Sequence, residues 1–145
     1  QSAYARSAAD YAAESFAGAL QRHFGACATL EQVEQSADAL LTMLRRWDHV
    51  TTSDYVRLDG EIYEATTRVL RAMPYDEYLR TDHWQATRSE ALERAHHHCQ
   101  VCNSADRLQT HHRSYQRRGE EAPEDLIVLC RKCHETFHKN GRLAR

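Results

Sequence analysis

The first half of the chain repeats apolar side chains at the three- and four-residue spacing that places them on one face of a helix. In the first stretch, from Ala3 to Phe24, the recurring apolar positions are Tyr4, Tyr11, Phe16, Leu20 and Phe24. In the second stretch they are Val33, Ala37, Leu40, Leu41 and Leu44. Each pattern predicts an amphipathic helix, and such helices in succession predict a helical bundle.

Capping residues and a proline set limits to these helices. Thr29 and Gln32 have the spacing of a capping box, so the second helix is expected to begin there. Ser53 or Asp54 is expected to cap a third helix, and Pro74 is expected to end it because proline cannot continue a helix. The apolar positions of this third helix are Val56, Ile62, Val69 and Leu70.

A fourth helix is expected immediately before the cysteine-rich part of the chain. Thr81 or Asp82 has a side chain suited to its N-cap, and the helix is expected to run to about His97. Trp84 and Leu92 are expected to face inward and to pack on the segment that follows.

Charge divides the chain into two unlike halves. Residues 1–80 hold 8 Lys and Arg against 12 Asp and Glu, a balance of −4, whereas residues 81–145 hold 11 against 9, a balance of +2. The two balances add up to the net charge of −2 for the whole chain. An acidic N-terminal half is an unsuitable surface for DNA, so residues 1–75 are expected to form a regulatory or assembly module and residues 76–145 a separate domain.

Four of the five cysteines lie in the C-terminal half as two Cys-x-x-Cys pairs, Cys99 with Cys102 and Cys130 with Cys133. Each pair places two thiolates on one tight turn, and two such turns can complete a four-sulfur zinc site. Disulfides or a redox motif are the alternatives. Disulfides suit small secreted domains, and flanking histidines are unusual for paired redox motifs. The fifth cysteine, Cys27, lies in a helical stretch and is expected to be a small buried apolar residue.

Histidines surround the cysteine pairs. His134 and His138 are four residues apart, so on a helix they project from one face and can bind one metal ion together. His111 and His112 are adjacent, so on a strand they point to opposite faces, and one could face the metal while its neighbour faces something else. The chain contains ten histidines in all, so ordinary surface histidines remain the alternative interpretation for each.

These residues resemble the HNH nuclease family, also called the ββα-metal nucleases, over about residues 78–139. The resemblance rests on four features: the cysteine pairs, the His111-His112 pair, the acidic-Leu step at Asp125-Leu126, and the HxxxH spacing of His134 and His138. It implies a β-hairpin and a helix that together hold a divalent metal ion. The predicted fold class is therefore mainly α, an N-terminal helical bundle followed by a small zinc-stapled ββα-metal domain.

The resemblance also implies a role for each residue of the site. His112 corresponds to the general base, and His111, His134 and His138 to ligands of the catalytic metal. Asp125 stands where the family usually has Asn. Because a carboxylate binds hard cations well, a ligand role for Asp125 is retained as an expectation. The implied cofactors are a structural Zn²⁺ and a catalytic divalent ion such as Mg²⁺, Mn²⁺, Ni²⁺ or Zn²⁺.

Basic residues near the histidines are candidates for contacts with DNA phosphates. Arg113, Arg117 and Arg118 follow the His111-His112 pair directly, and Lys132 lies between the second pair of cysteines. Lysine and arginine supply the donors that phosphate binding requires. Acidic residues between them support the alternative that they are ordinary solvated charges.

The sequence as a whole predicts a metal-dependent HNH endonuclease that acts on DNA. The main alternative is a noncatalytic zinc-ribbon-like module that binds nucleic acid. A further alternative is an assembly subunit that associates with a protein partner, or with itself, through the N-terminal helices. No apolar run is long enough to cross a membrane, so no membrane partner is expected. Reduced cysteines for zinc favour the cytoplasm.

Overall fold

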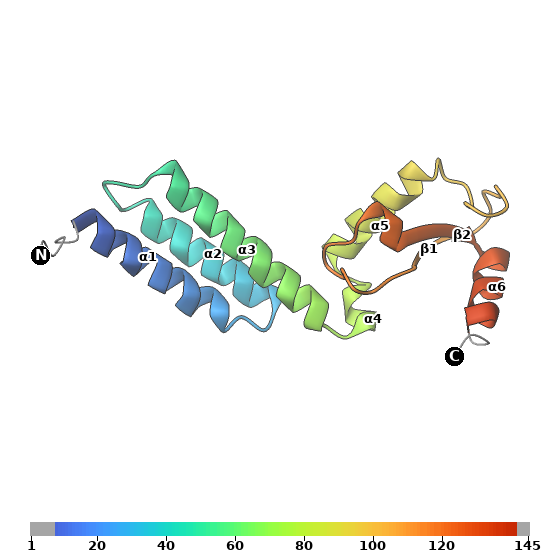
Figure 1. The fold of residues 1–145 in the computed structure, drawn as a ribbon, viewed down its shortest axis with the longest axis horizontal. Coiled ribbons are helices and arrows are strands. Elements are labelled where there is room, and N and C mark those ends of the chain that lie inside the picture. Colours follow the sequence, from blue (N-terminus) through green and yellow to red (C-terminus); the bar gives the residue numbers. More distant parts are fainter. Residues whose placement is uncertain (1–7, 142–145) are drawn as a thin grey trace, which may run out of the picture. The chain divides into compact units, whose positions relative to one another are not determined.

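The computed structural model describes residues 8–141, with side chains for residues 16–139. The chain divides between Leu70 and Arg71 into two compact units, which we call unit 1 and unit 2. Unit 1 is helical, whereas unit 2 combines helices with a two-stranded sheet (Figure 1). The predicted fold class, a helical bundle followed by a small ββα domain, is confirmed.

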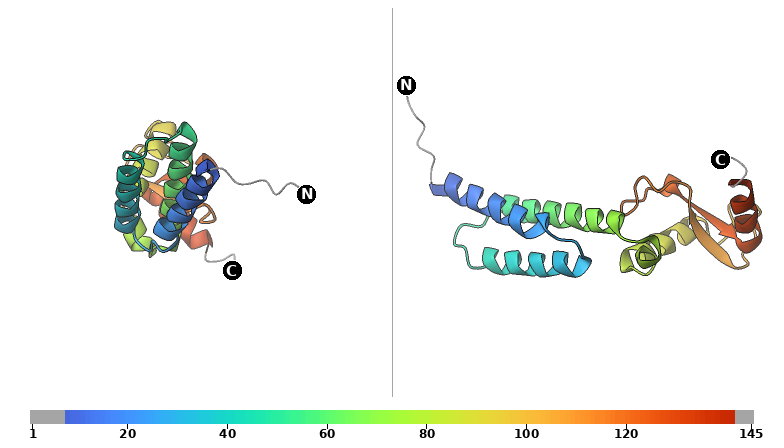
Figure 2. Two further views of the ribbon diagram at one scale, coloured as in Figure 1. Left: turned by 90° about the vertical axis from the view of Figure 1, so that its left-hand side faces the viewer. Right: turned by 90° about the horizontal axis from the view of Figure 1, so that it is seen from below.

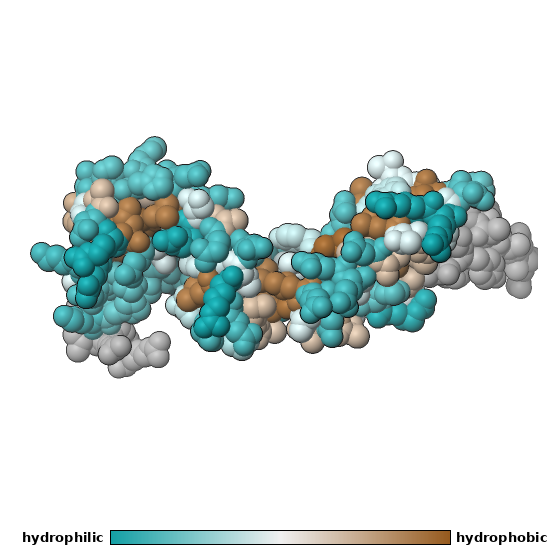
Figure 3. Space-filling view, turned by 180° about the vertical axis from the view of Figure 1, so that it is seen from behind, coloured by the Kyte–Doolittle hydropathy of each residue, from teal (hydrophilic) through white to brown (hydrophobic). Residues whose placement is uncertain are grey.

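Unit 1 is built from α1 (Ala8–Gly25), α2 (Leu30–Leu44) and α3 (Thr52–Ala72), whose last residues extend into unit 2. Phe16, Leu20 and Phe24 are buried, as the spacing of the first helix predicts, while Tyr4 and the side chain of Tyr11 lie outside the described part. The second helix contributes three buried residues to this core: Val33, Leu40 and Leu44. In the space-filling view most of the visible surface is hydrophilic and apolar side chains appear only in limited patches (Figure 3).

The cap of α2 is the predicted one. The backbone N–H of Gln32 donates to Thr29 Oγ1 over 3.2 Å, and the N–H of Ala28 donates to Gln32 Oε1 over 2.8 Å, so the capping box is complete. The cap of α3 is Thr51 instead of Ser53 or Asp54. Its hydroxyl accepts from the N–H of Asp54, and the Asp54 carboxylate accepts from the N–H of Thr51 in return.

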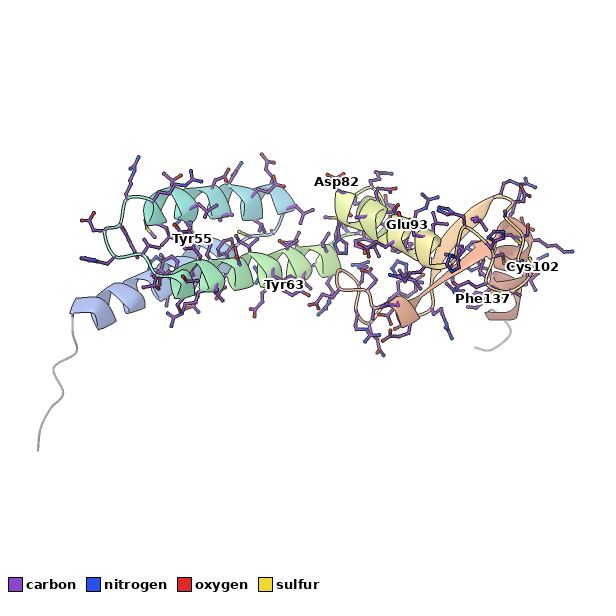
Figure 4. All side chains as sticks on the ribbon, turned by 90° about the horizontal axis from the view of Figure 1, so that it is seen from above. Tyr55, Tyr63, Asp82, Glu93, Cys102 and Phe137 are labelled. Atoms are coloured by element: carbon purple, nitrogen blue, oxygen red, sulfur yellow. The ribbon has the colours of Figure 1, made fainter. Side chains whose placement is uncertain are left out.

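The inward face of α3 also differs from the expectation at one position. Val56 is 64% exposed, whereas Leu58 is fully buried. Two residues correspond to about 200° around a helix, so both cannot face the core. Leu58, Ala65 and Val69 share one face, and this register turns Val56 to solvent while Tyr63 also projects from the helix (Figure 4).

Unit 2 begins where Pro74 ends α3 and becomes the N-cap residue of a short helix, α4 (Tyr75–Tyr78), which the sequence pattern did not predict. Thr81 then caps α5 (Asp82–Arg94) by accepting from the N–H of Trp84, so of the two candidate caps Thr81 is the one used. Helix α5 ends before the three histidines that follow it. Trp84 is buried as expected, and Ala91 is more deeply buried than its neighbour Leu92.

The sheet of unit 2 is an antiparallel hairpin of β1 (Leu108–His112) and β2 (Leu126–Cys130), in which His111 pairs with Ile127. Residues 113–125 connect the two strands and end in the 3-10 turn η1 (Pro123–Asp125). Helix α6 (Arg131–Gly141) continues directly from β2, as Figures 1 and 2 show, and contacts both strands. None of the described helices is long and apolar enough to span a membrane.

Candidate metal and catalytic site

Two turns of unit 2 bring four cysteine sulfurs together. Cys99 and Cys102 lie in the turn after α5, and Cys130 and Cys133 lie where β2 passes into α6. The four sulfurs all lie within 4.8 Å of one another. The turn is closed by hydrogen bonds in which the N–H of Cys99 donates to the carbonyl of Ser104 over 2.8 Å and the N–H of Gln100 donates to Val128 over 2.9 Å. This arrangement confirms a four-cysteine cluster positioned to hold a metal ion.

The donor chemistry of the cysteine cluster fits zinc. Burial raises the pKa of the Cys99 thiol, but hydrogen bonds from the backbone of Cys130, Cys102 and Val101 outweigh it and lower the pKa to about 6. A thiol with a lowered pKa readily becomes the thiolate that binds a metal. Four thiolates leave no open coordination position on a tetrahedral ion, so the cluster is suited to a structural role.

A second group of ligands is formed by the same hairpin and helix. His111 on β1 and His134 and His138 on α6 place one ring nitrogen each within 4.8 Å of the others. The Nε2 atoms of His134 and His138 are 3.1 Å apart, as expected for residues one helical turn apart. The structure therefore joins the three histidines that the sequence assigned to the catalytic metal.

The histidine cluster fits a divalent ion, because the pKa values of two of its imidazoles are shifted toward the neutral form. Burial and the neighbouring His138, His134 and His112 lower the pKa of His111 to about 4. Burial and His138 also lower the pKa of His134. Neutral imidazole is the form that binds metals, and three such ligands leave a coordination position open for water or substrate.

His112 lies on the opposite face of β1 and is outside this histidine cluster. It is 2% exposed, and its ring stacks on Trp84 at a centroid distance of 4.6 Å and on Tyr115 at 5.0 Å. Both ring nitrogens are engaged, because Nε2 lies 3.0 Å from Glu121 Oε1 and Nδ1 lies 3.3 Å from the hydroxyl of Tyr75. The alternation of β1 therefore separates the predicted base from the predicted metal ligands.

Glu121 is a functional candidate that the sequence analysis missed. Its side chain is 1% exposed, yet its carboxylate accepts from the hydroxyl of Tyr78, from His83 Nε2 at 3.2 Å, and from the N–H of Gly119 at 3.2 Å, besides the bond with His112. Burial raises the pKa of Glu121, but the hydrogen bonds from His112, His83 and Tyr78 outweigh it and hold the pKa well below its ordinary range. Glu121 is therefore a buried carboxylate that remains charged.

Asp125 is outside the histidine cluster and closes the loop between the strands. Its carboxylate accepts from Arg117 Nε at 2.7 Å and Nη2 at 3.0 Å, and from the N–H of Ala122 at 3.0 Å. Its main-chain carbonyl accepts from the N–H groups of Arg113 and Ser114. The carboxylate is thus used by a bidentate arginine and a backbone donor, and the structure does not bring it to the histidines as a metal ligand.

The basic residues proposed for DNA contact fall into two groups. Arg117 is paired with Asp125, and Arg118 donates to the main-chain carbonyls of Arg71 and Met73. Arg113 and Lys132 have exposed side chains. The charge pattern could not distinguish the two groups, because pairing depends on how the loop folds back on itself.

Comparison with known families agrees with this geometry. The family model described as HNH endonuclease matches residues 99–140, which include both cysteine pairs and the His111, His134 and His138 cluster. No curated protein and no solved structure matches the chain. The family match supports a nuclease-type function in general terms. Residues 99–140 therefore match the HNH endonuclease family and include the four-cysteine cluster positioned to hold a metal ion.

Proposed function

We propose that this protein is a metal-dependent endonuclease that hydrolyses DNA phosphodiester bonds through unit 2. The observation that carries the proposal is the cluster of His111, His134 and His138, three metal-binding nitrogens within 4.8 Å of one another inside the segment that matches the HNH family. A second set of ligands would be superfluous in a purely structural zinc module, since the four cysteines already satisfy one ion.

The chain's own residues supply the binding of the ion and the acceptance of a proton. His111, His134 and His138 would hold a divalent ion, which as a Lewis acid stabilises charge on the phosphate and on the leaving oxygen. His112 is the proposed general base that takes a proton from the attacking water. Its Nδ1 is covered by the hydroxyl of Tyr75, so this contact has to open before water can reach the base. Tyr75 is 40% exposed, which leaves its ring room to move.

Arg113 and Lys132 are the proposed DNA-binding residues, because both are exposed and neither has the intramolecular commitments of Arg117 and Arg118. Phosphate contacts of this kind provide affinity and orientation without base specificity. Residues 1–75 are proposed to regulate or assemble the nuclease, through a protein partner or self-association. Reduced thiolates suit the cytoplasm, which is the proposed location.

Cleavage of supercoiled plasmid tests the proposal. The zinc-loaded chain is assayed with Mg²⁺, Mn²⁺, Ni²⁺, Co²⁺ and Zn²⁺, beside His111→Ala, His112→Ala and the control His97→Ala. We expect metal-dependent nicking or linearisation that His111→Ala and His112→Ala each reduce at least about 100-fold, since general-base catalysis alone contributes 10²–10⁴-fold. His97 is exposed and belongs to neither cluster, so its variant retains the native rate.

The noncatalytic alternative has one observation in its favour, the burial of His112 away from the histidine cluster. It predicts DNA binding without cleavage in every metal, and binding that is unchanged in His111→Ala. A folded, zinc-loaded native chain with those properties would contradict the endonuclease proposal. Zinc content and the thermal unfolding of each variant are measured in parallel, so that loss of activity is separated from loss of fold.

A further inference from the structure

His112 is held by more than its place on β1, and the group that holds it is Glu121. We infer that Glu121 is the positioning residue of His112: its carboxylate keeps a proton on Nε2 and leaves Nδ1 as the nitrogen that accepts a proton. The inference rests on the proposed function for its consequence in catalysis. Its structural part, the choice of tautomer, can be measured without any activity.

The direction of the hydrogen bond follows from the partners. An ionised carboxylate has acceptor sites and no proton to donate, so the 3.0 Å bond between His112 Nε2 and Glu121 Oε1 requires the proton to lie on Nε2. In neutral imidazole the other nitrogen then carries the lone pair. The Tyr75 hydroxyl, 3.3 Å from Nδ1, can donate to that lone pair.

The ring has little freedom to escape this arrangement. Trp84 and Tyr115 both stack on it, with interplanar angles of 20° and 22°, and Tyr75 contacts it at 69°. A ring enclosed in this way keeps its nitrogens in fixed directions, Nε2 toward Glu121 and Nδ1 toward Tyr75. Tyr75 and Tyr115 are 40% and 53% exposed, so the Nδ1 side is the one that borders solvent. The proton-accepting nitrogen is therefore on the side from which water can arrive.

A merely structural role for Glu121 is the competing explanation. The same carboxylate binds Tyr78 of α4, His83 of α5 and the backbone of Gly119, so it also ties these elements to the strand loop. Such a role predicts that a substitution lowers stability and leaves the tautomer of His112 unchanged. The two explanations therefore differ in the tautomer of His112 that they predict for the variant, and ¹⁵N chemical shifts report this tautomer directly.

Glu121→Gln should reverse the tautomer while nearly conserving shape. The N–H of Gly119 can only donate and lies against Oε2, so it draws the amide oxygen to that side. The amide NH₂ then faces His112 Nε2, which has to accept and must lose its proton to Nδ1. The hydroxyl of Tyr78, which shares Oε1, can rotate to accept as well.

The experiment measures ¹⁵N chemical shifts of the His112 side chain in the zinc-loaded full chain, together with kcat, KM, zinc content and thermal unfolding. We expect Nε2–H in the native chain and in the control Glu120→Gln, whose side chain is 33% exposed and pairs with Arg71. We expect Nδ1–H in Glu121→Gln, with kcat lowered about 100-fold or more and KM little changed, because a general base in the wrong tautomer cannot accept the proton.

A second variant keeps the inference testable if Glu121→Gln does not fold. Tyr75→Phe removes the hydroxyl from Nδ1, and Nε2–H should persist because Glu121 determines it. Nδ1–H in the native chain, or a change of tautomer in Tyr75→Phe, would overturn the inference. The inference would also be overturned if Glu121→Gln kept the proton on Nε2, or if it moved the proton to Nδ1 without changing kcat. If the native chain cleaves no DNA in any metal, the proposed function fails, and the tautomers alone decide whether Glu121 positions His112.

Discussion

Unit 1 and unit 2 bury different kinds of side chain. Among the described residues, the buried positions of unit 1 are apolar apart from Thr67 and a single thiol, Cys27. Those of unit 2 include Cys99, Cys130, His112 and Asp125, each of which has a titratable group. Unit 1 thus has a largely apolar helical core. Unit 2 instead buries titratable side chains, which need a metal ion or specific hydrogen-bond partners.

This difference indicates where each unit obtains its stability. Burial of apolar area stabilises unit 1 in proportion to the surface removed from water. Unit 2 has cysteine sulfurs where unit 1 has apolar side chains, so a bound metal is expected to contribute to its folding free energy. Cys99, Cys130 and the apolar residue Leu129 form one buried group, against which Cys133 packs, so sulfur ligands take the place of core side chains there.

Cys99→Ser is expected to cause the largest difference in stability between the two units. Loss of one thiolate removes zinc from a site whose binding free energy is roughly 10 kcal/mol or more in zinc-finger peptides, and unit 2 should unfold while unit 1 stays helical. Hydrogen exchange followed by mass spectrometry measures the amide protection of both units in the same full chain. The control is Cys27→Ser, which changes a buried cysteine of unit 1 outside the cluster. Equal protection of residues 99–139 in the native chain and Cys99→Ser would refute the idea that zinc holds unit 2.

Leu58→Ala tests the opposite half of the comparison. Leu58 is fully buried in unit 1, and truncation of a buried leucine to alanine costs about 3 kcal/mol in well-packed cores. The loss should appear as lower protection of unit 1, with zinc content unchanged. Val56→Ala is the matched control, since Val56 is 64% exposed and lies two residues away on the same helix. The assigned register of α3 is wrong if the two variants lose equal stability.

The sequence predicted contacts that follow from local spacing and missed those that depend on the loop. The Cys-x-x-Cys turns, the His134–His138 spacing and the alternation of His111 with His112 are set by backbone geometry, and the structure has each of them. Glu121 has no periodic pattern around it. Its partners come from α4, α5, β1 and the loop itself, so only the folded chain brings them together.

Arginine pairing was unpredictable for a related reason. Arg113, Arg117 and Arg118 look alike in the sequence, but a guanidinium pairs with whichever carboxylate or carbonyl the loop presents. Asp125 presents both oxygens to Arg117, whereas Arg118 reaches the carbonyl of Met73. Thr51 shows the same limit on a smaller scale, because the sequence analysis expected Ser53 or Asp54 to cap α3 and only the position of the backbone distinguishes Thr51 from these polar neighbours.

Asp125→Ala should destabilise unit 2 less than the loss of zinc, and less than Leu58→Ala destabilises unit 1. It removes the acceptor of the Arg117 guanidinium and of the Ala122 N–H, and thereby opens the loop between the strands. Arg117 and the Ala122 N–H lower the pKa of Asp125 against the effect of burial. The stabilisation is thus present above the ordinary carboxyl pKa of about 3.9 and is lost as the pH falls through the lower folded pKa.

Thermal unfolding of unit 2 from pH 7 down to pH 3 measures this effect, with Asp106→Ala as the control because Asp106 is exposed and pairs only with its neighbour Arg107 among the bonds described. The stability gap between the native chain and Asp125→Ala should be largest near neutral pH and should narrow on acidification. A gap that is constant over this range would contradict a charged Asp125 as the closing residue of the loop.

Thr51→Ala should produce the smallest effect, confined to unit 1. The hydroxyl of Thr51 accepts from the N–H of Asp54, and loss of such a cap costs about 1 kcal/mol. The matched control is Thr52→Ala, because Thr52 is exposed in the first turn of the same helix without serving as its cap. Hydrogen exchange should increase only in the first turns of α3, and both clusters of unit 2 should keep their metal content. A loss of zinc in Thr51→Ala would instead mean that the two units do not depend on separate sources of stability, and the contrast between an apolar unit and a metal-held unit would have to be abandoned.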